Sequence, residues 1–149
     1  MSTIERSIDV DVPVRTAYDQ WTQFEDFPQF MEDVERIVQL DDSTTHWVVK
    51  VAGAEREWDA DITEQKPDER IAWRSRGETQ HAGVVTFHKL DEAKTRVMLQ
   101  MDVEPNDWIE KAGDALGVIE RNVQRDLDNF KGFIEQRGTE TGAWRGEID

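Results

Sequence analysis

Hydrophobic and polar residues change their spacing twice in the first thirty positions of the chain. Apolar residues alternate with polar ones over residues 4–12, which predicts a β-strand, although Arg6 interrupts the pattern. Pro13 suits the first turn of a helix. Apolar residues then recur at spacings of three and four, at Val14, Ala17, Tyr18 and Trp21. This region therefore predicts one strand followed by a short helix with a single buried stripe.

The segment 22–31, TQFEDFPQFM, concentrates aromatic residues around a proline. Pro28 lacks a backbone N–H and clashes with the preceding turn of a helix, so one continuous helix is excluded here. The residue before a proline also favours an extended conformation. We therefore expect the chain to bend and a second short helix to begin near Pro28.

From residue 34 onward the hydrophobic period becomes two, which is typical of strands. Six strands are expected, at residues 34–40, 45–53, 56–64, 69–76, 81–90 and 94–103. Their short, turn-rich connections imply antiparallel neighbours. Alternation places one set of residues on a buried face: Trp47, Val49, Val51, Trp58, Ala60, Ile62, Ile71, Trp73, Ser75, Gly83, Val85, Phe87, Val97, Leu99, Met101 and Val103. The opposite face is rich in charged residues, so we expect it to face water.

The hairpin around Lys66 suggests a register for two of these strands. Opposite charges and large-with-small pairs are favourable cross-strand neighbours. The expected pairs are Glu64 with Glu69, Asp59 with Arg74, Glu57 with Arg76, Trp73 with Ala60 and Trp58 with Ser75. In this register the carboxylates Glu57, Asp59 and Asp61 form an exposed ion-pair ladder rather than a catalytic group.

A long helix is expected over about residues 106–137, because apolar residues repeat at three and four between a polar N-cap at Asn106-Asp107 and a stop at Gly138. The chain thus divides into a domain at 1–138 and a C-terminal tail at 139–149. Either Trp144 docks this tail on the domain or the tail is mobile.

Composition narrows the possible functions. The chain has 149 residues, enough for one domain, and a formal net charge of -15, which repels nucleic acid and anionic lipid surfaces. Apolar runs are too short to cross a bilayer and no signal-peptide pattern is present, so we expect no membrane insertion and a cytoplasmic protein. There is no cysteine, and the three histidines are scattered, so no metal site is expected. No phosphate-binding or dinucleotide-binding motif is present, and we expect no cofactor.

The order of elements, together with the segment WTQFEDFPQFM after the first helix, resembles the START-like helix-grip superfamily over about residues 3–137. Within it the chain is most similar to the polyketide cyclase/dehydrase branch, which also holds coenzyme Q-binding proteins. The resemblance implies an α+β fold in which a curved antiparallel sheet of about seven strands surrounds the long C-terminal helix, with two short helices after the first strand. It also implies a cavity between sheet and helix that holds a lipid, a quinone, a polyketide or another apolar molecule.

Candidate ligand-binding residues follow from this cavity: Phe30, Met31, Trp58, Trp73, His81, Phe87, Met101, Gly113, Leu116 and Gly117. We expect Phe30 and Met31, after the bend, to cover the cavity mouth, and Phe24 and Phe27 to anchor the helices. The aromatic residues either stack on a flat ligand or simply fill the core. The two glycines leave room either for a ligand or for close helix packing. His81 and Tyr18 are the only candidates for proton transfer, and a structural role is the alternative for both.

Three functions remain open. The first is binding or transport of a small hydrophobic molecule, which the shortage of inward titratable groups favours. The second is a polyketide aromatase/cyclase or dehydratase, which needs only to fold a reactive chain and supply one or two protons. The third is a regulatory module that binds a protein partner, for which an acidic surface is suited to a basic partner.

Overall fold

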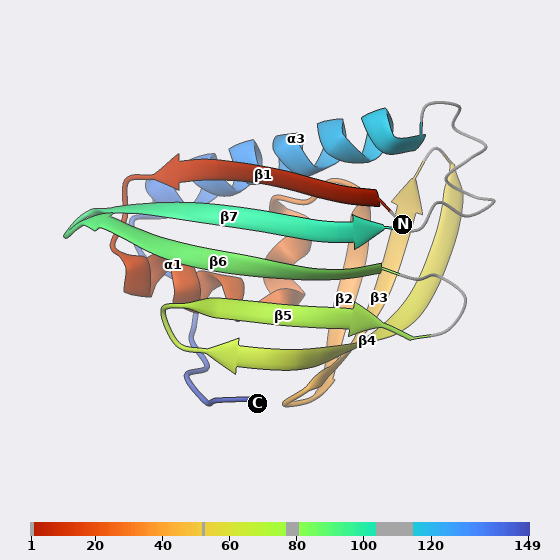
Figure 1. Cartoon of the computed structure of the whole chain (residues 1–149), viewed down its shortest axis with the longest axis horizontal. Helices are drawn as coiled ribbons and strands as arrows, with labels where there is room; N and C mark the ends of the chain where they lie inside the picture. Colours follow the sequence, from red (N-terminus) through yellow and green to blue (C-terminus); the bar gives the residue numbers. More distant parts are fainter. Residues whose placement is uncertain (1, 52, 77–80, 104–114) are drawn as a thin grey trace.

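The computed structural model describes residues 2–51, 53–76, 81–103 and 115–149. Its elements are β1 (Ser2–Val10), α1 (Val14–Trp21), the 3-10 helix η1 (Phe24–Gln29), β2 (Val34–Asp41), β3 (Thr44–Val51), β4 (Ala54–Lys66), β5 (Arg70–Ser75), β6 (His81–Asp91), β7 (Lys94–Val103) and α3 (Ala115–Arg137). The strands form one antiparallel sheet in the order β1-β7-β6-β5-β4-β3-β2. Figure 1 shows this curved sheet with the long helix α3 along β1 and the short helix α1 at the end of the sheet where β1 ends, and η1 lies against β2. The predicted helix-grip architecture is confirmed. The residues expected to begin the long helix, 106–114, lie outside the described part.

The bend after α1 differs from its prediction. Pro28 lies near the end of η1 and does not begin a helix. A 3-10 helix this short needs few hydrogen bonds, and the backbone N–H groups of Phe30 and Met31 both donate to the Phe27 carbonyl at 3.0 and 2.8 Å. The missing N–H of Pro28 therefore costs little at this position.

The register between β4 and β5 also differs from its prediction. Ala60 pairs with Ser75 and Ile62 with Trp73, two residues away from the expected alignment. The turn is tighter than expected, with Asp68 in the left-handed region at φ 64°, and a bulge lies between Ile62 and Glu64. The tighter turn alone would put the apolar residues of β4 and β5 on opposite faces of the sheet. The extra residue of the bulge returns them to the same face. The predicted faces are therefore correct although the predicted pairs are wrong.

Aromatic side chains from the segment between α1 and β2 pack against α3 over the inner face of the sheet. The ring of Trp21 lies 4.9 Å from that of Phe130 and 5.4 Å from that of Phe27, and Phe30 lies 5.2 Å from Phe130. Full burial of each such side chain is worth roughly 1.5–3 kcal/mol. This cluster holds α1, η1 and α3 to one another.

Arg6, which interrupts the first apolar alternation, lies on the inner face because its strand partner is Leu99. Its guanidinium donates to the Glu120 carboxylate on α3 at 2.7 Å. Arg6 thus links the edge strand β1 to α3, the helix that runs along it.

The C-terminal segment docks on the domain. The Gln20 amide and Thr141 exchange hydrogen bonds, and the Ile148 backbone exchanges two more with Gln65 at 2.8 and 3.0 Å. The Arg145 guanidinium pairs with Asp19 on α1 and with Asp68 in the β4–β5 turn. The tail therefore closes one end of the domain, through several contacts rather than through Trp144 alone. Among the described helices, none has the length and apolar character to span a membrane.

Candidate functional site

The inner face of the sheet is fully buried at one end and only partly buried at the other. At the α1 end, Tyr18 is fully buried and its ring meets Phe87 edge-on at 5.3 Å. At the opposite end, four apolar side chains are only partly buried although they belong to the inner face: Trp47, Trp58, Trp73 and Met101. The partly buried end therefore exposes some aromatic surface.

Two strand pairings build this aromatic surface. Trp47 on β3 pairs with Trp58 on β4, and their rings stack with centroids 6.3 Å apart and planes 8° apart. Trp73 on β5 pairs with Gly83 on β6, where a Cβ would lie only 2.5 Å from the indole. The glycine leaves the space that the Trp73 ring occupies. The Trp47–Trp58 stack, Trp73 and Met101 form what we call the aromatic floor.

His81 lies beside this floor at the start of β6. Its ring meets that of Trp58 edge-on at 5.0 Å, and its backbone N–H donates to Ser75 Oγ at 2.9 Å. Within the described part of the chain, both ring nitrogens of His81 and Nε1 of Trp58 are buried with no hydrogen-bond partner. Leaving such a group unpaired costs about 1–3 kcal/mol. Three adjacent nitrogens thus lack the partner that buried polar atoms normally have.

Burial lowers the pKa of His81 from its usual 6.5 to about 4. The imidazole is therefore neutral at pH 7 and offers one donor and one acceptor. Trp58 Nε1 adds a second donor. Together they suit an oxygen-bearing group on an otherwise apolar ligand.

Tyr18 and His81 are not brought together. Tyr18 contacts Phe87, which lies six residues beyond His81 on β6, or roughly 20 Å along the strand. Burial raises the pKa of Tyr18, so its hydroxyl stays protonated. The two candidates for proton transfer therefore cannot act on the same small group.

The other candidate residues are distributed along the same face. Phe30 is 2% exposed and belongs to the aromatic cluster around Phe130, whereas Met31 is partly buried against the core. Phe87, 5% exposed, lies at the Tyr18 end. Leu116 and Gly117 belong to α3, and Gly113 lies outside the described residues. Trp58, Trp73, His81 and Met101 are the candidates that gather at the partly buried end.

The exposed face shows a different charge arrangement from the predicted ladder. His46 contacts Asp59 at 2.7 Å and Glu57 at 3.0 Å, and these carboxylates raise the pKa of His46. Arg76 instead pairs with Asp61, its Nε donating at 2.9 Å. The shifted register brings Arg76 within reach of Asp61 rather than Glu57, and Asp59 and Glu57 instead contact His46 from the paired strand β3. Among the described residues, no cluster of histidines and carboxylates has the geometry of a metal site.

Comparison with known proteins places these features in a family. Residues 10–131 match the family described as polyketide cyclase/dehydrase and lipid transport. The chain is 60% identical to an uncharacterized 17.2 kDa protein from the melC2-rnhH intergenic region of Streptomyces lincolnensis, and the match covers 99% of both chains.

Solved structures share the fold at low sequence identity. The Zhui aromatase/cyclase from Streptomyces sp. R1128 superposes with a TM-score of 0.77 at 19% identity, covering 96% of this chain and 99% of that one. A START superfamily protein from Mycobacterium smegmatis gives 0.74 at 15% identity, covering 91% and 98%. A protein from Thermus thermophilus gives 0.78 at 17% identity, covering 93% and 100%. With the family match over most of its length, this chain belongs to the polyketide cyclase/dehydrase and lipid transport family.

Proposed function

We propose that this protein binds a small hydrophobic molecule, lipid, quinone or polyketide-like, on the aromatic floor between the sheet and α3. The observation that carries this proposal is the set of three buried, unpaired nitrogens of Trp58 and His81 beside partly exposed tryptophans. Apolar walls with a few convergent polar groups are characteristic of small-molecule sites.

The side chains favour a flat ligand that carries at least one carbonyl or hydroxyl oxygen. Aromatic contacts contribute about 0.5–1.5 kcal/mol beyond the area they bury. A ligand oxygen that accepts from Trp58 Nε1 or His81 also removes the cost of leaving those donors unpaired. A purely aliphatic ligand gains only the burial of its apolar surface.

The test begins with native mass spectrometry of freshly purified protein, to detect and identify any co-purified molecule. Tryptophan fluorescence then follows titration with quinones, fatty acids and aromatic polyketides. We expect His81→Gln and Trp58→Phe to weaken binding of an oxygen-bearing aromatic ligand about tenfold. His46→Gln, the same change on the exposed face, serves as the control and leaves the affinity unchanged. No response to any compound, with nothing bound after purification, would remove the proposal.

A second candidate function, aromatase/cyclase or dehydratase activity, is supported by the structural likeness to the Zhui aromatase/cyclase. A histidine with a pKa of about 4 is a weak base at neutral pH, so such an activity relies mainly on folding the chain of the substrate. The test is product formation from a poly-β-ketone substrate. Equal rates for the wild type and a His81→Gln, Tyr18→Phe double variant would exclude both residues from the chemistry.

A further inference from the structure

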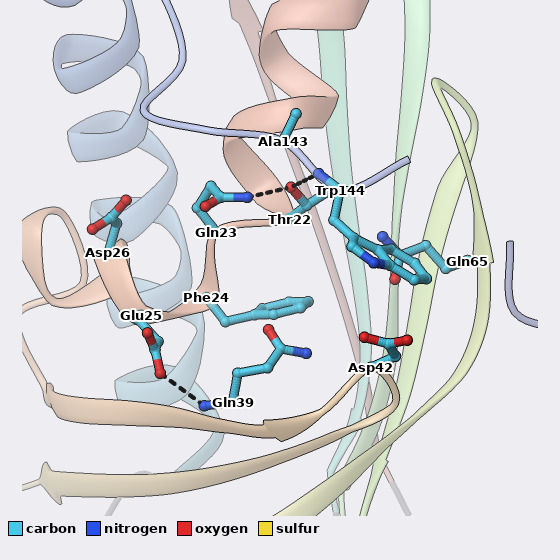
Figure 2. Close-up of a pocket in the computed structure, with 10 residues that line it drawn as sticks. All are labelled: Thr22, Gln23, Phe24, Glu25, Asp26, Gln39, Asp42, Gln65, Ala143 and Trp144. Atoms are coloured by element: carbon cyan, nitrogen blue, oxygen red, sulfur yellow. Dashed lines mark hydrogen bonds between the residues drawn. The ribbon is translucent and has the colours of Figure 1, made fainter. Parts of the chain in front are cut away.

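A second candidate site is a pocket on the outside of the domain, away from the aromatic floor. It has a volume of about 320 Å³ and is lined by residues from the end of α1 to η1, the β2–β3 hairpin, the end of β4 and the C-terminal segment. Figure 2 shows Phe24 near its centre and Trp144 and Gln65 to one side. This volume is at the lower end of the range of roughly 300–1,000 Å³ for small-molecule sites.

The C-terminal segment forms one wall of this pocket and is held in place by the domain. The backbone N–H of Trp144 donates to Thr22 Oγ1 at 3.1 Å, and Thr22 Oγ1 also accepts from the Gln23 amide at 2.9 Å (Figure 2). On the far side of Trp144, the paired backbones of Ile148 and Gln65 hold the segment against β4. The C-terminal segment is thus held by hydrogen bonds on both sides of Trp144, which fixes the position of the Trp144 ring.

Gln65 is a buried polar side chain that lines this pocket. It is 1% exposed, and neither its amide oxygen nor its amide nitrogen has a hydrogen-bond partner of standard geometry in the described part of the chain. The Gln65 amide lies close to the Tyr18 hydroxyl, and their interaction opposes the larger rise that burial causes in the Tyr18 pKa. The two groups do not form a hydrogen bond of standard geometry, so the Tyr18 hydroxyl is unpaired as well. Buried amides are normally paired, because an unpaired one costs about 1–3 kcal/mol. The Gln65 amide therefore has unused hydrogen-bond donors and acceptors next to the pocket.

The charged residues that line the pocket favour a positively charged ligand. Three carboxylates line the pocket, those of Glu25, Asp26 and Asp42, and no lysine or arginine of the described residues joins them. Glu25 accepts from the Gln39 backbone N–H at 3.0 Å, and Asp26 accepts from the Thr141 hydroxyl. Asp42 has no hydrogen-bond or ion-pair partner among the described residues. A cation gains here from a free carboxylate, and an anion is repelled.

Phe24 and Trp144 add aromatic surface to the same lining. Aromatic faces attract organic cations, by roughly 0.5–1 kcal/mol at exposed sites and more where water is excluded. They also bury the apolar body of a ligand, which a bare metal ion lacks. The combination of carboxylates, aromatic rings and a buried amide suits a protonated amine attached to an apolar group.

We infer that this pocket is a binding site for a small organic amine, held by Asp42 and the Gln65 amide with its apolar part against Phe24 and Trp144. The inference does not depend on the function proposed for the aromatic floor. The two sites share no lining residue, so each can be tested while the other is left intact.

The test uses the full chain and three monoamines, benzylamine, phenethylamine and tryptamine, with benzyl alcohol and benzoate as neutral and anionic controls. Two-dimensional NMR follows the Gln65 side-chain amide and the Trp144 indole resonances at ligand concentrations up to about 10 mM, which detects millimolar affinity. We expect at least one amine to shift both resonances, and neither control compound to do so. Higher salt weakens the binding, because the attraction is partly electrostatic.

Variants identify the groups responsible. We expect Asp42→Asn to weaken amine binding about fivefold and Gln65→Met, which keeps the length of the side chain, to weaken it by a similar factor. Glu92→Gln removes the same charge from the β6–β7 turn, where the carboxylate is 95% exposed, and leaves the affinity unchanged. The inference is overturned if no amine shifts the two resonances, if benzyl alcohol shifts them equally, or if Asp42→Asn binds as the wild type does.

Discussion

Gly83 gives the sharpest test of the packing at the aromatic floor. An added Cβ at this position would lie 2.5 and 2.6 Å from two atoms of the Trp73 ring and 3.0 Å from the Gln100 carbonyl oxygen. Ordinary carbon contacts are about 3.5–4.0 Å, so the indole has to move by about 1 Å. The backbone of β7 blocks movement of the new methyl group in the other direction.

The magnitude for Gly83→Ala follows from two opposing contributions. Overpacking typically costs about 1–3 kcal/mol, and replacing a strand glycine by alanine returns about 0.5–1 kcal/mol. The net loss in the free energy of unfolding is therefore between about 0 and 2.5 kcal/mol, with a middle value near 1 kcal/mol. For a chain of this size the middle value lowers the Tm by about 2–4 °C, which thermal unfolding followed by circular dichroism measures directly.

A double-mutant cycle with Trp73→Phe isolates the cause. Phenylalanine lacks the outer ring whose atoms meet the new methyl group, so Gly83→Ala becomes neutral or slightly stabilising in that background. Gly132→Ala is the matched control, because no atom lies within 4 Å of its Cβ position and alanine is the better helix former in α3. We expect it to raise the Tm. An equal loss from Gly83→Ala in both backgrounds would refute this account of the Trp73 packing.

Two further predictions concern buried charge. The pKa of His81 is 6.5 in the unfolded chain and about 4 in the folded one, so the unfolded state binds one more proton between these pH values. The free energy of unfolding is therefore expected to fall by on the order of 3 kcal/mol as the pH is lowered through this window. Urea unfolding should show this loss for the wild type and not for His81→Gln. Indistinguishable pH profiles would contradict the burial of a neutral imidazole. Arg145→Met leaves the Asp19 carboxylate, 2% exposed, with only the more distant Arg15 guanidinium at 3.7 Å, and should lower the free energy of unfolding by about 3 kcal/mol in urea titrations. Arg96→Met, which breaks an exposed pair, should change it far less, and equal effects of the two variants would argue against tail docking as a stabilising contact.

Several features of the site were predictable from local pattern because they depend on the face of a strand alone. Alternation placed Trp47, Trp58, Trp73 and Met101 on one side of the sheet, and the structure confirms that side for each of them. His81 was expected on the same side, and its burial lowers its pKa as an inward position requires. A period of two reports the face of a residue whatever strand lies beside it.

The outer pocket depends on features that periodicity does not report. Gln65 lies just beyond the expected strand at 56–64, three positions after Ile62, and the bulge after Ile62 turns it inward. No local signal in the sequence marks that bulge. Trp144 was recognised as a possible docking residue, but its neighbours Thr22 and Gln65 come from distant parts of the chain.

The amino-acid sequence by itself determined the class of fold, the order of its elements and the inner face of β3 to β7, because these follow from the spacing of apolar residues within short segments. The tertiary structure decided the pairing of β4 with β5, the packing of Tyr18 against Phe87, which lies roughly 20 Å along β6 from His81, and the docking of the C-terminal segment. Each of these depends on the offset between segments far apart in the chain. That offset is chosen by the packing of the whole domain, where a single bulged residue changes which side chains meet.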